Sequence, residues 1–212
     1  MIIFKREYEK TLEIIAKNPQ TQMQWIHIYG EHGSGKKEFI ESLRSKQLPN
    51  ATLIFQFNFN VFPFHNWQYF QQLIRHLTQQ HADEFQQFLT PLPARFATSI
   101  QHALAAAIYP DEENAFQRST DAWEFYIFTE FVKFLSRKKP GVIVLHGIFE
   151  KENEFRSRLL NSLMQIKNEP ILVLSSGSQP NADFESTPFF KNLWIKKRSV
   201  REVKNWLPLN SN

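Results

Sequence analysis

The chain has 212 residues, enough to build one sizeable core as a single domain or as a domain with a small appendage. Hydrophobic residues make up 42% and charged residues 22%, close to the globular average, which excludes a disordered or fibrous protein. The net charge of +4 is mildly basic, which permits contact with nucleic acid without indicating it.

Cysteine is absent, which excludes a disulfide framework and a thiolate metal site and fits a reducing compartment. The amino terminus becomes charged too early for a secretory signal, and no apolar run approaches the roughly 18 residues of a membrane span. We therefore expect a cytoplasmic protein that does not enter a membrane.

Phenylalanine is unusually abundant, with 21 residues against five tyrosines and five tryptophans. Such a composition predicts a core packed with large rings. Some of these rings could instead line a partner-binding face. We expect the core to hold most of them.

Strand and helix patterns alternate from the amino terminus. Residues 6–17 carry apolar side chains at helical spacing and predict a surface helix. The apolar run 25–30 predicts a short buried strand that ends at a glycine, and a new helix is expected to begin at Lys36. Residues 52–59, which are β-branched and aromatic, predict a second strand.

Residues 65–138 predict a helical insertion between the second and third strands. The clearest helical segments are 68–80, 96–108 and 121–137. Asp121 is the expected cap at the start of the last one.

The second half of the chain returns to the alternating pattern. Residues 141–147 form a continuous apolar run, typical of a strand covered on both faces in a parallel sheet. A helix at 152–167, a similar strand at 170–178 and a fifth strand at 193–197 are expected to follow. This order predicts an α/β fold with three layers and a parallel sheet, in which ligands bind beyond the carboxyl ends of the strands.

We expect one domain over residues 1–212, with a basic carboxyl-terminal segment, 191–212, that resembles the start of a missing lid domain. Basic and aromatic residues alternate in this segment, so it could follow a nucleic-acid backbone. A solvated helix face is the favoured interpretation. The residues concerned are Trp194, Lys196, Lys197, Arg198, Arg201, Lys204 and Trp206.

A glycine-rich stretch separates the first predicted strand from the following helix. The pattern G-x-x-x-x-G-K-[ST] is met by Gly30, Gly35 and Lys36 but fails at Lys37, which replaces the hydroxyl residue. In such loops, backbone N–H groups and a helix amino end point at phosphates, and the lysine reaches the terminal ones. The expected binding residues are Gly30, Glu31, His32, Gly33, Ser34, Gly35, Lys36, Lys37 and His146.

The groups that hold magnesium in working enzymes of this kind are both replaced. The hydroxyl after the lysine normally ligates the ion, and an aspartate at the end of a later strand supports it. Here Lys37 and His146 occupy these positions, and Gly147 follows. An ammonium about 4 Å from a divalent ion is repelled by roughly 8 kcal/mol at an effective dielectric constant of 20. We therefore doubt that magnesium binds, and expect Lys37 to attract the phosphates of ATP or ADP in its place.

Three outcomes stay open. The loop could be an empty remnant in a scaffold, it could bind nucleotide without efficient hydrolysis, or the chain could be an ATPase that uses a substitute acid. The candidate acids are Glu150, Glu152 and Glu154. We nominate no catalytic residue and no metal ligand, because the seven histidines lack the spacing of a metal site. His146 could contact a phosphate or could be a hydrogen-bonded core histidine.

The order of these segments is similar to that of a known family. Arg6-Glu7-x-Glu9 precedes a short helix, and "IHIYGEHGSGKKEFIESL", "VIVLHGIFE" and "ILVLSSGS" follow. This succession resembles the nucleotide-binding module of the AAA+-related signal-transduction ATPases with numerous domains. The likeness spans most of the chain, although the glycine loop is its only specific motif.

The resemblance implies phosphate-binding roles for Gly30, Gly33, Gly35 and Lys36. It places the metal-binding role on Lys37 and His146, which cannot perform it, and the sensor region at Ser175–Ser178, which has no arginine. It thus implies a pseudo-ATPase that regulates through protein partners or self-association. Such modules normally continue into a lid, a winged helix and repeats, so we expect an isolated domain of a larger regulator or a small relative.

Overall fold

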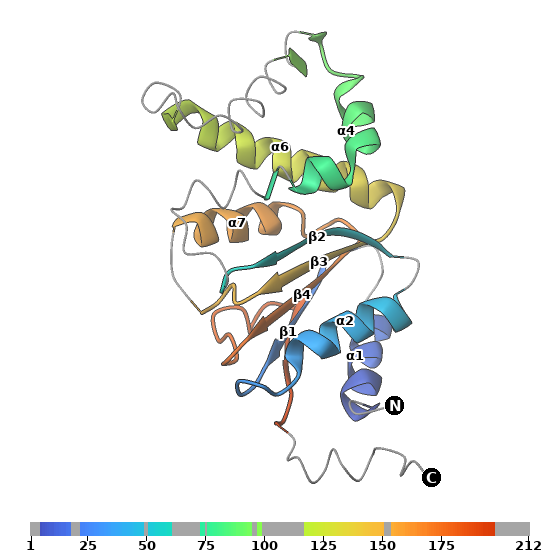
Figure 1. Cartoon of the computed structure of the whole chain (residues 1–212), viewed down its shortest axis with the longest axis vertical. Coiled ribbons are helices and arrows are strands. Elements are labelled where there is room, and N and C mark those ends of the chain that lie inside the picture. Colours follow the sequence, from blue (N-terminus) through green and yellow to red (C-terminus); the bar gives the residue numbers. More distant parts are fainter. Residues whose placement is uncertain are drawn as a thin grey trace, which may run out of the picture.

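The computed structural model describes residues 5–17, 22–48, 51–60, 73–74, 76–94, 97–98, 117–150 and 154–197. Five parallel strands form one sheet in the order β2-β3-β4-β1-β5 (Figure 1). The strands are β1 (Gln24–Tyr29), β2 (Thr52–Asn58), β3 (Gly141–His146), β4 (Ile171–Gly177) and β5 (Phe190–Trp194). The predicted parallel sheet is therefore confirmed.

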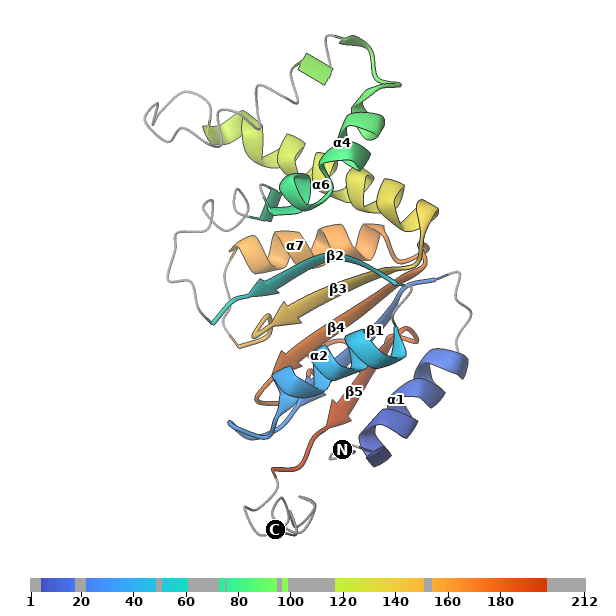
Figure 2. The ribbon, with the colours of Figure 1, turned by 45° about the vertical axis from the view of Figure 1, so that its right-hand side comes forward.

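Helices cover both faces of this sheet. They are α1 (Lys5–Lys17), α2 (Lys36–Gln47), α4 (Ala82–Leu89), α6 (Gln117–Lys138) and α7 (Glu154–Gln165). Helix α2, with α1 beside it, packs on one face, and α7 and α6 pack on the other (Figure 2). The protein thus has the predicted three-layer α/β architecture, and α4 and α6 lie between β2 and β3 in the chain.

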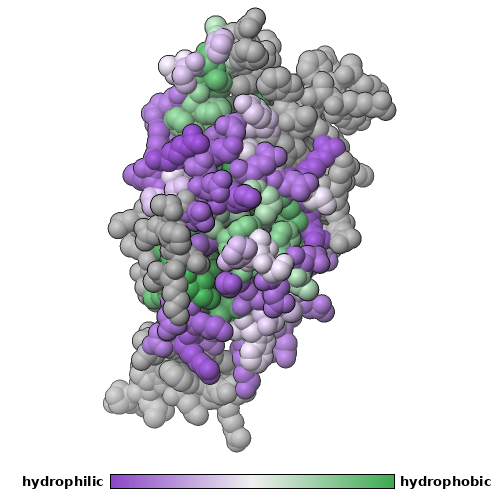
Figure 3. All heavy atoms as spheres, turned by 180° about the vertical axis from the view of Figure 1, so that it is seen from behind, coloured by the Kyte–Doolittle hydropathy of each residue, from purple (hydrophilic) through white to green (hydrophobic). Residues whose placement is uncertain are grey.

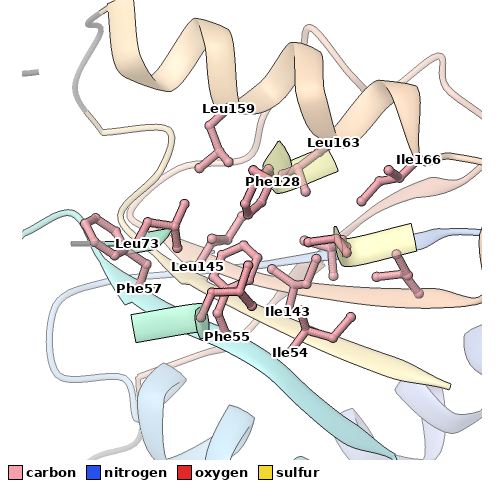
Figure 4. Packing of buried hydrophobic residues seen from close by; sticks show 14 of the residues in the cluster. Ile54, Phe55, Phe57, Leu73, Phe128, Ile143, Leu145, Leu159, Leu163 and Ile166 are labelled. Carbon is pink, nitrogen blue, oxygen red and sulfur yellow. The ribbon is translucent and has the colours of Figure 1, made fainter. Parts of the chain in front are cut away.

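The larger of two hydrophobic clusters fills the space between the sheet and helices α6 and α7 (Figure 4). In it, the ring of Phe128 from α6 meets the ring of Phe55 from β2 edge-on, with centroids 5.5 Å apart. Leu159 and Leu163 of α7 are also fully buried there. Burying one such side chain stabilises the fold by about 1.5–3 kcal/mol, so this cluster fixes the helices on the sheet.

The abundant phenylalanines serve this core. The phenylalanine side chains that the structure describes are all buried or packed against the two hydrophobic clusters. Among the described residues, the large hydrophobic side chains that are exposed are those of Tyr126 and Trp194. Figure 3 shows one face of the molecule, on which hydrophilic residues predominate and hydrophobic ones gather in smaller areas. The expectation that phenylalanine builds the core is confirmed for this part of the chain.

The insertion also covers the open edge of the sheet. His81 Nε2 lies 3.2 Å from the carbonyl oxygen of Leu53 and 3.0 Å from that of Ile54, and Gln80 donates to the first of these oxygens at 2.9 Å. An exposed edge strand invites pairing with other chains, and these side chains occupy two of its acceptors. His81 therefore has a structural role.

Two sequence-based boundaries are wrong. Strand β5 begins at Phe190, before the predicted 193–197, because Phe190 is buried and lies opposite Trp25 of β1. Helix α6 begins at Gln117, so Asp121 lies inside the helix and is not its cap. A capping residue is only a local signal, and tertiary context overrides it.

Other predictions fall partly outside the described residues. Of the predicted helix 68–80, residues 73–74 and 76–80 are helical, and of 96–108 only 97–98 are described. Most of the basic segment 191–212 also lies outside the described part. The single-domain organisation therefore stays a prediction.

Candidate phosphate-binding site

The chain leaves two neighbouring strands in opposite directions. From β1 it crosses by way of α2 to β2, at one edge of the sheet, and from β4 it passes to β5 at the other edge. A crevice at such a switch point, outside the carboxyl ends of parallel strands, is the usual ligand site of open α/β sheets. The glycine loop, residues 30–35, lies at this point (Figure 2).

The loop conformation requires glycine. The φ angles of Gly30, Gly33 and Gly35 are 154°, 74° and 84°, a region that other residues rarely adopt. A Cβ atom on Gly30 would lie only 2.3 Å from the carbonyl oxygen of Ile195, just beyond β5. The absence of a side chain therefore lets the loop close against the neighbouring strand.

The amino end of α2 follows directly, because the helix begins at Lys36 with Gly35 as its cap. The first N–H groups of a helix have no intrahelical acceptor, and the helix dipole makes this end positive. A glycine loop that leads into a helix amino end is the arrangement that binds phosphate in many proteins. The prediction that a helix begins at the lysines is confirmed.

Lys36 closes the loop on itself. Its ammonium donates to the carbonyl oxygens of Gly30 and Glu31, both at 2.8 Å, and lies 3.5 Å from Ser34 Oγ. Burial lowers the pKa of Lys36, and the negative charge of Glu150 opposes this effect. Lys36 is therefore held within the loop by backbone carbonyls, and its role in binding phosphate stays a prediction.

His146 ends β3 at the position expected for the aspartate and is buried. Its Nδ1 lies 2.9 Å from Ser176 Oγ, and its Nε2 lies 3.4 Å from Nε2 of Gln56. Burial lowers the pKa of His146, and the positive charge of Lys37 lowers it further, while Glu41 opposes. The positive charge of Lys37 is therefore near enough to His146 to disfavour protonation of the ring.

Further polar contacts connect His146 of β3 to Gln56 of β2 and to Glu41 of α2. Gln56 Nε2 donates to Glu41 Oε1 at 3.0 Å, and Arg44 donates to the other oxygen of the same carboxylate, also at 3.0 Å. Burial alone would raise the pKa of Glu41, but the hydrogen bonds from Arg44 and Gln56, together with the charges of Arg44 and His146, outweigh burial and lower the pKa. Glu41, Arg44 and Gln56 were not predicted as site residues from the sequence. A possible signal was Glu41, one helical turn after Lys37.

The residues at this position do not fit magnesium. This ion requires near-octahedral oxygen ligands. Here both ring nitrogens of His146 face Ser176 and Gln56, Lys37 adds a positive charge, and Glu41 is engaged by Arg44. Within the described residues, no group of three or more His, Cys, Asp or Glu side chains could hold a metal ion.

The remaining predicted residues lie at the tip or the base of the loop. Glu31, His32 and Gly33 are exposed, whereas Ser34 is buried and its N–H donates to the Glu31 carbonyl at 3.2 Å. Of the substitute acids, Glu150 lies near enough to act on the charge of Lys36. Glu152 and the side chain of Glu154 lie outside the described part.

A second histidine, His27, was considered from the sequence only as one of seven possible metal ligands, and it contacts the predicted sensor region. His27 of β1 is fully buried, with Nδ1 2.9 Å from Ser175 Oγ and Nε2 2.9 Å from the carbonyl oxygen of Gln179. Trp25 donates to the same Ser175 oxygen at 2.7 Å. Burial lowers the pKa of His27 from 6.5 to about 4, so the ring is neutral near pH 7.

No protein-family model and no curated protein match this sequence. Among solved structures, the chain is similar to a signal transduction ATPase with numerous domains (STAND) protein with a tetratricopeptide repeat sensor from Pyrococcus horikoshii. The TM-score is 0.42 and the identity 17%, over 88% of this chain and 22% of that chain. It is also similar to a chain in the structure of Drosophila ORC bound to GC-rich DNA and Cdc6, with a TM-score of 0.44, 11% identity, and 94% and 30% of the two chains covered.

The chain therefore spans less than a third of either of these proteins. The fold is assigned from the strand order, the parallel pairing and the glycine-loop geometry of this chain. No described helix is long and apolar enough to cross a membrane.

Proposed function

We propose that the chain is a regulatory phosphate-loop domain that binds ATP or ADP through the phosphates without magnesium, and hydrolyses the nucleotide poorly or not at all. The observation that carries this proposal is the chain of contacts from His146 through Gln56 to Glu41, at the end of β3 where the motif expects the aspartate, with the positive charge of Lys37 acting on His146.

The charge balance supports binding without metal. A nucleoside triphosphate or diphosphate is strongly anionic. Its phosphates would face the positive charges of Lys36 and Lys37 and the positive amino end of α2. The same arrangement does not support hydrolysis, because Lys37 and His146 stand where the motif has the hydroxyl and the aspartate that hold the metal, and this metal offsets charge on the transferred phosphoryl group. A bound nucleotide would then stabilise one state of the domain instead of being turned over, and protein partners would respond to that state.

Calorimetric titration with ATP and ADP tests this proposal, once in EDTA and once in magnesium, together with an assay of phosphate release. We expect saturable binding of similar affinity in both buffers and no appreciable release. Lys36→Met is the matched control, since it removes the ammonium and keeps the length of the side chain. Strongly magnesium-dependent binding with steady phosphate release would overturn the proposal.

A nucleotide-independent scaffold is the second candidate. It is favoured by the contacts of Lys36 with the carbonyls of Gly30 and Glu31, which satisfy the ammonium within the loop. In that case neither nucleotide nor inorganic phosphate produces heat in the titration or raises the melting temperature. Self-association or a stable complex with a partner, detected by light scattering, would then support the scaffold.

A further inference from the structure

A cavity of about 390 Å³ lies at the carboxyl end of the sheet, between the turn after β3 and the loop after β4. Its volume falls within the range of small-molecule sites. The cavity is lined by Phe149, Glu150, Arg156, Gly177, Ser178, Gln179, Pro180, Asn181, Ala182 and Asp183. None of these residues belongs to the glycine loop or to α2.

A buried cation forms part of the wall. Arg156 of α7 is only 9% exposed, and its guanidinium carbon lies 5.6 Å from the ring centroid of Phe149. This cation–π contact fixes the guanidinium group. A guanidinium has up to five N–H donors in a planar array that matches a carboxylate, so its place in the lining suits a ligand that carries a carboxylate.

Two carboxylates line the same cavity. Glu150 and Asp183 are both exposed, in contrast to Arg156. The lining therefore combines one buried positive charge with two exposed negative charges. The two carboxylates would repel a simple anion such as inorganic phosphate. A molecule that carries both a negative and a positive charge would match both the guanidinium and the carboxylates.

The loop wall is held in place by the core. Gln179 accepts a hydrogen bond from His27 through its carbonyl, and Asn181 exchanges two hydrogen bonds with Asn192 of β5, both at 3.1 Å. Asn181 also accepts from the N–H of Phe184 at 3.2 Å. A rigid wall reduces the entropy that a ligand loses on binding, so the cavity is pre-formed.

We propose that this cavity binds a small zwitterion with the chemistry of a free α-amino acid. Its carboxylate pairs with Arg156, its ammonium group faces Glu150 and Asp183, and its side chain packs on the ring of Phe149. The cavity lies beside the phosphate loop, since its lining residue Glu150 also acts on the charge of Lys36. Its proposed ligand contacts nevertheless come from residues outside the loop, so binding there does not require a nucleotide.

Thermal-shift measurements on the full chain with each standard amino acid, followed by calorimetry of those that stabilise it, test this proposal. We expect at least one to bind in the millimolar range or better. Its N-acetyl derivative and its carboxamide should each bind at least about tenfold more weakly, because each loses one charged contact. Arg156→Gln should abolish binding, while Arg158→Gln, on the same helix but away from the cavity lining, should retain it.

The derivatives keep the proposal falsifiable even if Arg156→Gln does not fold, since they require no variant. Absence of binding by every amino acid overturns the proposal. Equal binding of the derivatives also overturns it, as does an Arg156-dependent site that accepts only inorganic phosphate. Lys36→Met should not weaken amino-acid binding, because it removes a positive charge that acts on Glu150, whereas it should weaken nucleotide binding. The two titrations therefore separate failure of this site from failure of the nucleotide site.

Discussion

The combined substitution Lys37→Ser and His146→Asp restores the two groups that the glycine-loop motif lacks. The serine hydroxyl would replace the ammonium, and the new aspartate would stand between Ser176 and Gln56, which contact His146 now. We expect this double variant to acquire magnesium-dependent nucleotide binding.

The expected magnitude follows from the removed charge. A unit charge about 4 Å from a divalent ion costs roughly 8 kcal/mol at an effective dielectric constant of 20. Because Lys37 is exposed, it can move away and solvent screens it, so only a small part of this energy is effective. Even about 1.4 kcal/mol changes a dissociation constant tenfold. We therefore expect magnesium to tighten nucleotide binding at least about tenfold in the double variant and to have little effect on the native chain.

Paired calorimetric titrations in magnesium and in EDTA give this ratio directly. Lys37→Ser alone is the control, and it should weaken binding in EDTA because one positive charge is lost. In the double variant the new aspartate adds a negative charge near Glu41, so the melting temperature should fall in EDTA and recover with magnesium. If magnesium affects the native chain and the double variant equally, the reasoning about Lys37 and His146 is wrong.

Four further predictions concern the loop and the core. Lys36→Met should weaken nucleotide binding at least about tenfold in calorimetry, because a charged hydrogen-bond donor to phosphate contributes about 1.5–3 kcal/mol. Gly30→Ala should lower the free energy of unfolding by about 2–3 kcal/mol in urea titrations, since the new Cβ would overlap the Ile195 carbonyl. Gly33→Ala has no atom within 4 Å of the new Cβ, so only the backbone strain of about 1 kcal/mol is expected. The free energy of unfolding should also decrease as the pH is lowered, by about 2 kcal/mol between about pH 7 and about pH 5. The reason is that His27 binds a proton in the unfolded chain over this range but stays neutral in the folded chain.

The sign of the pH effect follows from the lowered pKa. His27 titrates near 6.5 when unfolded and at about 4 when folded, so its contribution is complete above 6.5 and is lost as the pH falls toward 4. His146 acts in the same direction, since its pKa is also lowered. Urea titrations of His27→Gln should give a lower stability at neutral pH and a flatter pH profile. An equally steep profile in this variant would contradict the assignment.

Strands buried on both faces were predictable from sequence, because β3 contains the apolar run VIVL and β4 begins with the apolar run ILVL. Strand β5 was harder to place, since it lies at the edge and its burial is uneven, with Lys191 and Trp194 exposed. The glycine loop was predictable because its spacing encodes a backbone conformation.

The network around His146 was not predictable in the same way. Gln56 and His146 are 90 residues apart in the chain, and His27 and Gln179 are 152 apart. Their contacts arise from the strand order, which a single sequence does not specify. Arg156 was equally inconspicuous, because only the folded chain brings it beside the ring of Phe149 and the loop after β4.

The ratio of ATP dissociation constants in EDTA and in magnesium, measured on the native chain with phosphate release followed in the same samples, tests the central claim most directly. We predict a ratio near one and no turnover. Binding that requires magnesium and is followed by steady phosphate release would contradict the account.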